Sequence, residues 1–240
     1  LGSWGQDFAP RQRLGDLVAA LLARTDIPRL RLSSLEPWDL EPEFFDLWKD
    51  TRLCPHLHLP LQSGSAAILK RMARKTAPRA FAALVAAARA AIPDVAITTD
   101  VIAGFPGESD AEFEETLEFV QGMDFAGGHV FTYSARPGTP AARMRGQVRG
   151  DVARERSALL RAAFAGSARA YRARFVGRTL SVLWETTDRL SDRGWRMAGL
   201  SGNYLRVTAT ASRPLWNVLS PARLTGLEGD GLTAVIEAAP

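Results

Sequence analysis

The sequence predicts an α/β protein in which a parallel sheet, forming a barrel or part of one, is followed by a small all-β barrel of the OB-like kind. Residues 1 to about 133 alternate between strand-like and helix-like segments, and repeated βα units form parallel sheets. After residue 175 the pattern changes to short alternating stretches separated by Gly, Pro, Asn or Asp, which is typical of a small barrel.

Apolar periodicity predicts the elements of the first region. Apolar residues share one helical face between residues 11 and 24, whereas β-branched residues dominate the strand that begins at Ala96 and runs into a Gly-Pro-Gly turn. The expected helices span residues 11–24, 41–50, 65–72, 78–91 and 110–121. The expected strands are the end of a strand at residues 1–3, residues 30–34, 56–61 and 128–133, and the stretch from residue 96 to the glycine turn.

A long Arg- and Ala-rich helix over residues 151–174 separates the two regions. Beyond it, short strands are expected at residues 179–184, 195–199, 204–210, 223–225 and 232–236. The expected domains are a partial barrel over residues 1–145, a connecting helix over residues 146–174 and a small β-barrel over residues 175–240.

Composition limits the class of protein. A hydrophobic content of 46% and a charged content of 23% are those of an ordinary globular protein. No apolar run is long enough to span a membrane. The net charge of +4 permits an anionic partner. The single cysteine, Cys54, excludes an internal disulfide and indicates a reducing, cytoplasmic setting.

Polar and glycine-rich segments follow the expected strands of the first region. They are residues 1–5, 33–37, 58–65, 98–108 and 133–139. In parallel α/β folds the carboxyl ends of the strands form the binding face, and glycines let a ligand approach the backbone. The sequence therefore predicts a small-ligand site on this rim.

Residues 53–64, read as LCPHLHLPLQSG, resemble a motif of the radical-SAM tRNA methylthiotransferases, which modify the adenosine beside the anticodon. The resemblance covers nearly the whole chain, and residues 199–207 and 223–232 are similar to the RNA-binding TRAM domain of that family. The motif is most similar to that of the branch acting on N6-threonylcarbamoyladenosine. The isopentenyladenosine branch usually lacks the Cys-Pro-His opening, and the branch that modifies a ribosomal protein has a different strand around the glutamine.

This resemblance implies that S-adenosylmethionine (SAM) lies across the strand ends. The residues that match the SAM-binding segments are Ser34, Glu36, Gln62, Ser63, Asp100, Ile102, Gly104, Phe105 and Tyr133. Ile102, Gly104 and Phe105 match the segment that packs on the adenine, and the carboxylates of Glu36 and Asp100 are hydrogen-bond acceptors. For Asp100, a bond to a neighbouring loop is an equally weighted alternative.

The resemblance also implies two 4Fe–4S clusters in the full-length protein, one of which cleaves SAM to a radical that abstracts the hydrogen of adenine C2. Three thiolates hold each cluster, but this chain contains only Cys54. We therefore expect the ligands to lie upstream of residue 1 and the chain alone to be inactive. Two alternatives remain open: a non-catalytic RNA-binding module, and a radical-SAM enzyme that acts on a small molecule or a protein.

Arginines beside aromatic residues predict contact with RNA, because such surfaces bind phosphates and stack bases, and the resemblance implies that this RNA is a tRNA anticodon stem-loop. The expected RNA-binding residues are Arg172, Arg174, Tyr204, Arg206 and Arg223, although tryptophans such as Trp184 also suit a barrel core. Cys54, His56 and His58 share a strand face, but their spread along the strand favours packing over zinc binding. For His129 a structural role is favoured.

Overall fold

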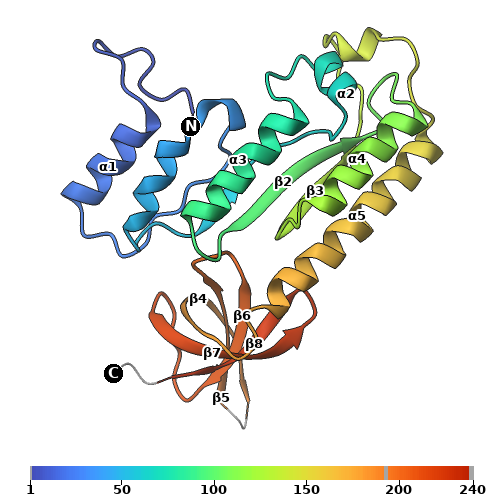
Figure 1. Cartoon of the computed structure of the whole chain (residues 1–240). Helices are drawn as coiled ribbons and strands as arrows, with labels where there is room; N and C mark the ends of the chain where they lie inside the picture. The colour runs from blue at the N-terminus through green and yellow to red at the C-terminus, as the bar shows by residue number, and fades with distance from the viewer. Residues whose placement is uncertain (1, 192–193, 238–240) are drawn as a thin grey trace.

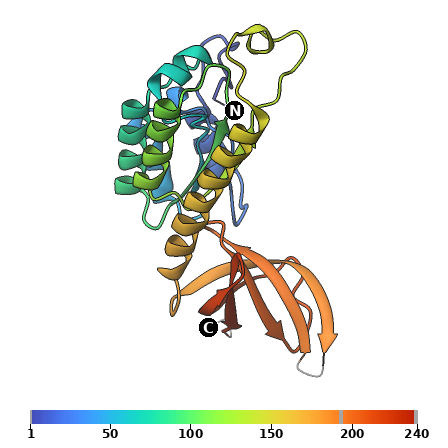
Figure 2. The ribbon, with the colours of Figure 1, turned by 90° about the vertical axis from the view of Figure 1, so that its right-hand side faces the viewer.

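A computed structural model describes residues 2–191 and 194–237. The chain folds into an α/β part and a small β-barrel, and the long helix α5 (Gly150–Ala173) runs from the first part down to the second (Figures 1 and 2). The prediction of a parallel sheet followed by a small closed barrel is confirmed. Within the described ranges, no helix is both long and apolar enough to cross a membrane.

The α/β part is built on a parallel three-stranded sheet in the order β1 (His56–His58), β2 (Ala96–Ala103) and β3 (Gly127–Thr132). Cα pairs such as His58↔Thr98 and Asp100↔His129 set the register. An isolated bridge from Gln62 to Val101 continues the pairing beyond β1.

Five α-helices and three 3-10 helices belong to the described chain. Besides α5 they are α1 (Leu14–Arg24), η1 (Pro37–Asp39), η2 (Pro42–Lys49), α2 (Ala66–Arg71), α3 (Pro78–Ala91), α4 (Asp110–Gly122) and η3 (Ala141–Arg143). Local chemistry explains several boundaries: α3 has Pro78 in its first turn, and the Ser109 and Glu112 side chains form a capping box for α4.

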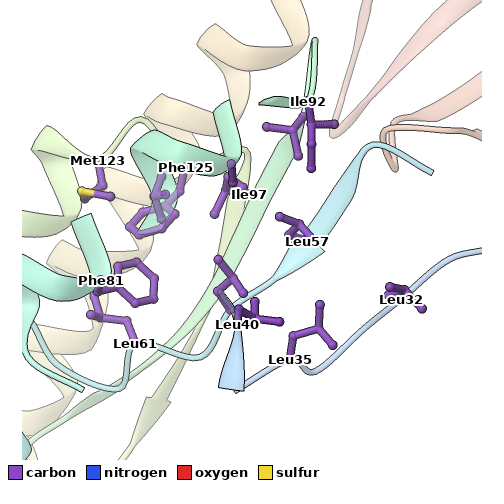
Figure 3. Close-up of a cluster of buried hydrophobic side chains, with 14 of the residues drawn as sticks. Leu32, Leu35, Leu40, Leu57, Leu61, Phe81, Ile92, Ile97, Met123 and Phe125 are labelled. Atoms are coloured by element: carbon purple, nitrogen blue, oxygen red, sulfur yellow. The ribbon is translucent and has the colours of Figure 1, made fainter. Parts of the chain in front are cut away.

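The main core lies between the sheet and the helices α3, α4 and α5. Phe81 of α3, Phe125 and Ile97 of β2 are fully or almost fully buried and lie close together in the core (Figure 3). Because successive side chains of a strand point to opposite faces, Ile97, Thr99 and Val101 are buried on the core side, while Thr98 and Asp100 point to the opposite face.

The small barrel closes in the order β4-β5-β6-β8-β7. Its strands are β4 (Thr179–Ser191), β5 (Gly194–Ser201), β6 (Arg206–Ala211), β7 (Leu219–Glu228) and β8 (Gly231–Ile236). Trp184 is fully buried in its core, and the indole Nε1–H donates to Ser220 Oγ at 2.8 Å. The alternative of a core tryptophan is therefore the right one for Trp184.

Some predicted elements are wrong. Residues 2–5 form turns rather than a strand end, and Leu1 lies outside the described residues. Residues 30–34 are not a strand, because Leu30 makes only an isolated bridge to Leu53. The predicted helix at 41–50 is the 3-10 helix η2, and β6 begins at Arg206 because Tyr204 has a left-handed backbone (φ 64°).

Two arginines of the α/β part hold the barrel. Arg29 donates to the carbonyl oxygens of Leu200 and Ser181, both at 2.9 Å. Arg31 donates to those of Gly202 and Ser201, both at 3.1 Å. These bonds fix β4, the end of β5 and the first residue of the loop after it against the segment that precedes β1.

Candidate ligand-binding face of the parallel sheet

The sheet has a second face that carries polar and aromatic side chains. Thr98, Asp100 and Ile102 of β2 alternate with the core residues and are each half-buried. On β3, His129 and Phe131 lie on this face, and their side chains are 73% and 53% exposed. We call it the open face; its groups are accessible to a ligand.

All three histidines of the chain join one hydrogen-bond network on the open face. Thr98 Oγ1 lies 3.0 Å from His56 Nε2 and 3.1 Å from His58 Nδ1. The Asp100 carboxylate lies 3.2 Å from His58 Nε2 and 3.1 Å from His129 Nδ1. The alternative for Asp100 was a bond to a neighbouring loop; the carboxylate instead bonds to side chains of the two neighbouring strands, β1 and β3.

The hydrogen bonds of this network have one consistent direction. The Asp100 carboxylate only accepts, so it receives the Nε2–H of His58 and the Nδ1–H of His129. The bare Nδ1 of His58 then accepts from the Thr98 hydroxyl, whose oxygen accepts the Nε2–H of His56. His56 Nδ1 is left bare, and it is buried with no hydrogen-bond partner in the described part of the chain.

His56 stays neutral in this arrangement. Burial is the main cause that lowers its pKa from 6.5 to about 3, with smaller electrostatic contributions from Arg31 and His58. The ring of Tyr204 stacks on the His56 ring, with centroids 4.5 Å apart and planes 14° from parallel. The His56 end of the network is therefore covered by Tyr204 of the small barrel.

A pocket of about 380 Å³ lies at the carboxyl ends of the strands. Three predicted SAM-binding residues line it: Gln62, Ile102 and Phe105. Gln62 has a left-handed backbone (φ 71°), a conformation that non-glycine residues adopt mainly at constrained sites. The other lining residues are Arg71, Met72, Ala73, Arg74, Thr139, Pro140, Ala141 and Met144. Three residues that were selected because they lie at strand ends therefore line one pocket.

Two further predicted residues adjoin this pocket. The Tyr133 ring packs edge-on against Phe105 at 5.4 Å between centroids, and its Oη is buried without a partner among the described residues. Glu36 pairs with Arg74 at 3.0 Å, and the Arg74 guanidinium lies over the Trp38 ring. Arg74 thus contacts a carboxylate of the rim.

The remaining predicted residues do not line this pocket. Ser63 is fully buried and its hydroxyl bonds to Thr116 Oγ1 at 2.9 Å, so it joins α4 to the loop after β1. Ser34 is exposed with a left-handed backbone (φ 55°). Gly2 and Trp4 line a separate cavity of about 510 Å³ beside α1 and η2. The expectation of a single rim is wrong for residues 2–5.

Gly104 serves packing. Its φ is +78°, and an added Cβ would lie 2.6 Å from Ala153 Cβ of α5. The Gly104 N–H donates to Glu108 Oε2 at 2.8 Å, and Arg156 of α5 donates to the same carboxylate oxygen at 2.8 Å. Burial raises the pKa of Glu108, against the opposing effects of these bonds. The glycine turn is thus attached to the helix that leads to the barrel.

The structure also includes residues that sequence reasoning missed. Ala141 and Met144 close the pocket from the segment between β3 and α5, and they carry no chemistry that marks them as ligand contacts. Only the hydroxyl of Thr139, which lies in a predicted rim segment, gave a signal there.

The predicted RNA-binding residues divide into two groups. Tyr204 and Arg206 line a groove of about 680 Å³ on the barrel, together with Arg196. Three acidic residues share this groove: Glu185, Glu228 and Asp230. The Arg206 guanidinium lies 2.9 Å from the Asp230 carboxylate, so part of the basic charge is already neutralised.

Arg172, Arg174 and Arg223 do not line that groove. Arg174 lies over the rings of Tyr171 and Phe175 and 3.9 Å from the Asp94 carboxylate. Arg223 lies 3.6 Å from Glu237. Of the five predicted residues, Tyr204 and Arg206 thus line the groove and the other three lie outside its lining.

The chain cannot hold an iron–sulfur cluster by itself. Cys54 is buried, burial raises the pKa of its thiol, and one thiolate cannot replace three. Within the described ranges no group of three or more His, Cys, Asp or Glu residues could hold a metal ion. His56 and His58 face Thr98 rather than a common metal position, in agreement with the packing role that the sequence favours.

Comparisons with known proteins agree with this architecture. Residues 3–120 match the radical SAM superfamily. The chain is 41% identical over 186 residues to a Thermotoga maritima protein named threonylcarbamoyladenosine tRNA methylthiotransferase MtaB, covering 77% of this chain and 42% of that protein. It is 39% identical over 218 residues to the tRNA-2-methylthio-N(6)-dimethylallyladenosine synthase of Acidothermus cellulolyticus, covering 89% and 44%.

A synthase of the same name from Maricaulis maris is 38% identical over 230 residues, which cover 95% of this chain and 46% of that protein. The chain thus spans about half the length of the curated relatives it matches. It belongs to the radical SAM superfamily and, within it, to the tRNA methylthiotransferase family. Radical SAM proteins use SAM and 4Fe–4S clusters, and methylthiotransferases use two clusters.

Proposed function

We propose that this chain supplies the SAM-binding sheet and the RNA-binding barrel of an enzyme that adds a methylthio group to C2 of N6-threonylcarbamoyladenosine at position 37 of tRNA. The observation that carries the proposal is the pocket of Gln62, Ile102 and Phe105 at the strand ends, in a chain 41% identical to a relative named for this substrate. The single cysteine supports a cytoplasmic setting.

The pocket fits SAM in its chemistry. Phe105 and Ile102 offer apolar surface to an adenine ring, and Gln62 offers an amide that donates and accepts. Arg71 Nε and Tyr133 Oη are buried polar atoms without partners among the described residues. SAM bound together with a 4Fe–4S cluster would supply the radical chemistry at adenine C2.

In this proposal the residues of the chain bind SAM, orient it and shield it. Arg74, held by Glu36, keeps a positive charge at the pocket, suited to a carboxylate. Met144 and Ala141 add apolar surface to the lining of the pocket. With a single cysteine, this chain offers no three-thiolate ligand set for a cluster.

The isopentenyl branch is the second candidate substrate class, since relatives named dimethylallyladenosine synthases match up to 95% of this chain. Anticodon stem-loops that differ only in the N6 group of the adenosine 3′ to the anticodon separate the two. We expect the threonylcarbamoyl stem-loop to bind more tightly than the isopentenyl one; the reverse order would assign the chain to the other branch.

The RNA role itself is tested by salt. Affinity for the stem-loop should fall steeply as the salt concentration rises, because phosphate contacts release counterions. Undetectable or salt-independent binding would contradict the role in RNA binding. The alternative of a non-catalytic module is tested by SAM: chemical shifts of Phe105 and Tyr133 that do not respond to SAM would favour the module.

A further inference from the structure

The open face ends in a free hydrogen-bond acceptor beside an exposed aromatic ring. The His129 Nδ1–H donates to Asp100, so in the neutral ring the other nitrogen, Nε2, carries a lone pair. The His129 side chain is 73% exposed and that of Phe131 is 53% exposed. Their ring centroids lie 6.4 Å apart.

The network behind His129 fixes which nitrogen is free. Asp100 is itself held by His58, and His58 by the hydroxyl of Thr98. The end of the network at His129 has a defined donor, because a carboxylate only accepts hydrogen bonds. The carboxylate therefore holds His129 in the Nδ1–H tautomer, with its acceptor facing the open side.

We propose that this pair binds an unstacked adenine base of RNA: the ring of Phe131 stacks on the base, and His129 Nε2 accepts a hydrogen bond from its N6–H. The chemistry points to a base because unstacked bases are recognised by aromatic stacking and by hydrogen bonds on their edges. Asp100 is a positioning residue that acts through His129. This inference rests on the proposed function and names the residues that receive the target base.

The groups around the pair suit a neutral heteroaromatic ligand. Ile102 pairs in register with Phe131 and lies on the same face, and it also lines the SAM pocket. A base on Phe131 thus lies next to the pocket proposed for SAM.

The test uses the whole chain and two stem-loop RNAs that differ in one substituent, an N6 hydrogen that a methyl group replaces. One carries N6-methyladenosine 3′ to the anticodon and has a single N6–H, and the other carries N6,N6-dimethyladenosine and has none. By fluorescence anisotropy the wild type should bind the first about tenfold more tightly, the size of one good hydrogen bond. His129→Ala should bring this ratio to about one, and Gln121→Ala, on the exposed surface of α4, should leave it unchanged.

Phe131→Ala should weaken the binding of both RNAs by about tenfold, because each base stacks on the ring. Asp100→Asn should reduce the ratio, and ¹⁵N shifts of the His129 ring should show the Nδ1–H tautomer in the wild type and its loss in this variant. A ratio that His129→Ala does not change, or an Nε2–H tautomer in the wild type, would overturn the inference alone. If neither RNA binds, the proposed function falls with it.

A further arm separates two sources of adenine. Saturating S-adenosylhomocysteine should leave the ratio unchanged if the base belongs to RNA. If it abolishes the ratio, the pair binds the adenine of SAM, and the inference is overturned.

Discussion

Tyr204 of the small barrel stacks on His56 of the parallel sheet, with ring centroids 4.5 Å apart. The Arg31 guanidinium lies 4.8 Å from the centroid of the same Tyr204 ring. Tyr204 was expected to stack on RNA, but its ring is already engaged between domains while 49% of the residue stays exposed. It therefore joins the RNA-binding candidate surface to the network of the open face.

Replacing Tyr204 should loosen this junction. Tyr204→Ala removes the stacked ring, and we expect a loss of about 1 kcal/mol in the free energy of unfolding, seen as a lower urea midpoint. Tyr204→Phe keeps the ring and should behave as wild type. Equal stability of all three proteins would show that the stack contributes nothing.

We expect Arg31 to act through the geometry of its hydrogen bonds and not only through its positive charge. Its planar fork donates to the carbonyls of Ser201 and Gly202, a geometry that lysine cannot reproduce. In Arg31→Lys we expect faster hydrogen exchange at residues 202–205, while the amides of α3 stay protected. Arg24→Lys, in the last turn of α1, is the matched control. Unchanged exchange in Arg31→Lys would contradict the role of the fork.

The burial of His56 predicts a pH-dependent stability. Its folded pKa of about 3 lies below its ordinary 6.5, so its stabilising contribution is present above pH 6.5 and is lost as the pH falls towards 3. The free energy of unfolding should fall by at most about 1.4 kcal/mol per pH unit from this group. Urea unfolding from about pH 7 to pH 4 should show a shallower slope for His56→Gln. Parallel curves would show that His56 is protonated in the folded protein.

Gly104 and Gly138 form a matched pair. Both have a positive φ, +78° and +86°, but an added Cβ meets Ala153 at 2.6 Å only at Gly104. Gly104→Ala should cost about 3 kcal/mol through strain and overpacking, whereas Gly138→Ala should cost about 1 kcal/mol. Thermal unfolding measures both. Similar losses would mean that the close approach of α5 is not needed.

Local chemistry made part of the fold predictable. The β-branched run from Ala96 and the proline at the start of α3 gave elements whose starts agree with the structure. The strand predicted at residues 30–34 is wrong because this extended segment pairs only at isolated points. Leu30 bridges to Leu53, and the Leu35 N–H then donates to the His58 carbonyl. Such irregular pairing has no signature in the sequence.

The site was predictable only where strand ends dictate it. Gln62, Ile102 and Phe105 converge because parallel strands end on the same rim. Ser63 and Gly104 do not line the pocket, because a hydroxyl and a glycine can also serve the packing of the fold. Here the Ser63 hydroxyl bonds to Thr116, and Gly104 lets Ala153 approach closely. The polar network of the histidines depends on the register of three strands, which the sequence alone does not give.

Photocrosslinking tests the central claim most directly. A stem-loop RNA carrying a photoreactive adenosine analogue 3′ to the anticodon is bound to the 240-residue chain and irradiated, and the attached peptides are mapped by mass spectrometry. We predict crosslinks on the open face, in the peptides that contain Asp100 and residues 129–131. Crosslinks confined to the barrel strands or to the outer surfaces of α3 and α4 would contradict the assignment of this face to the modified base.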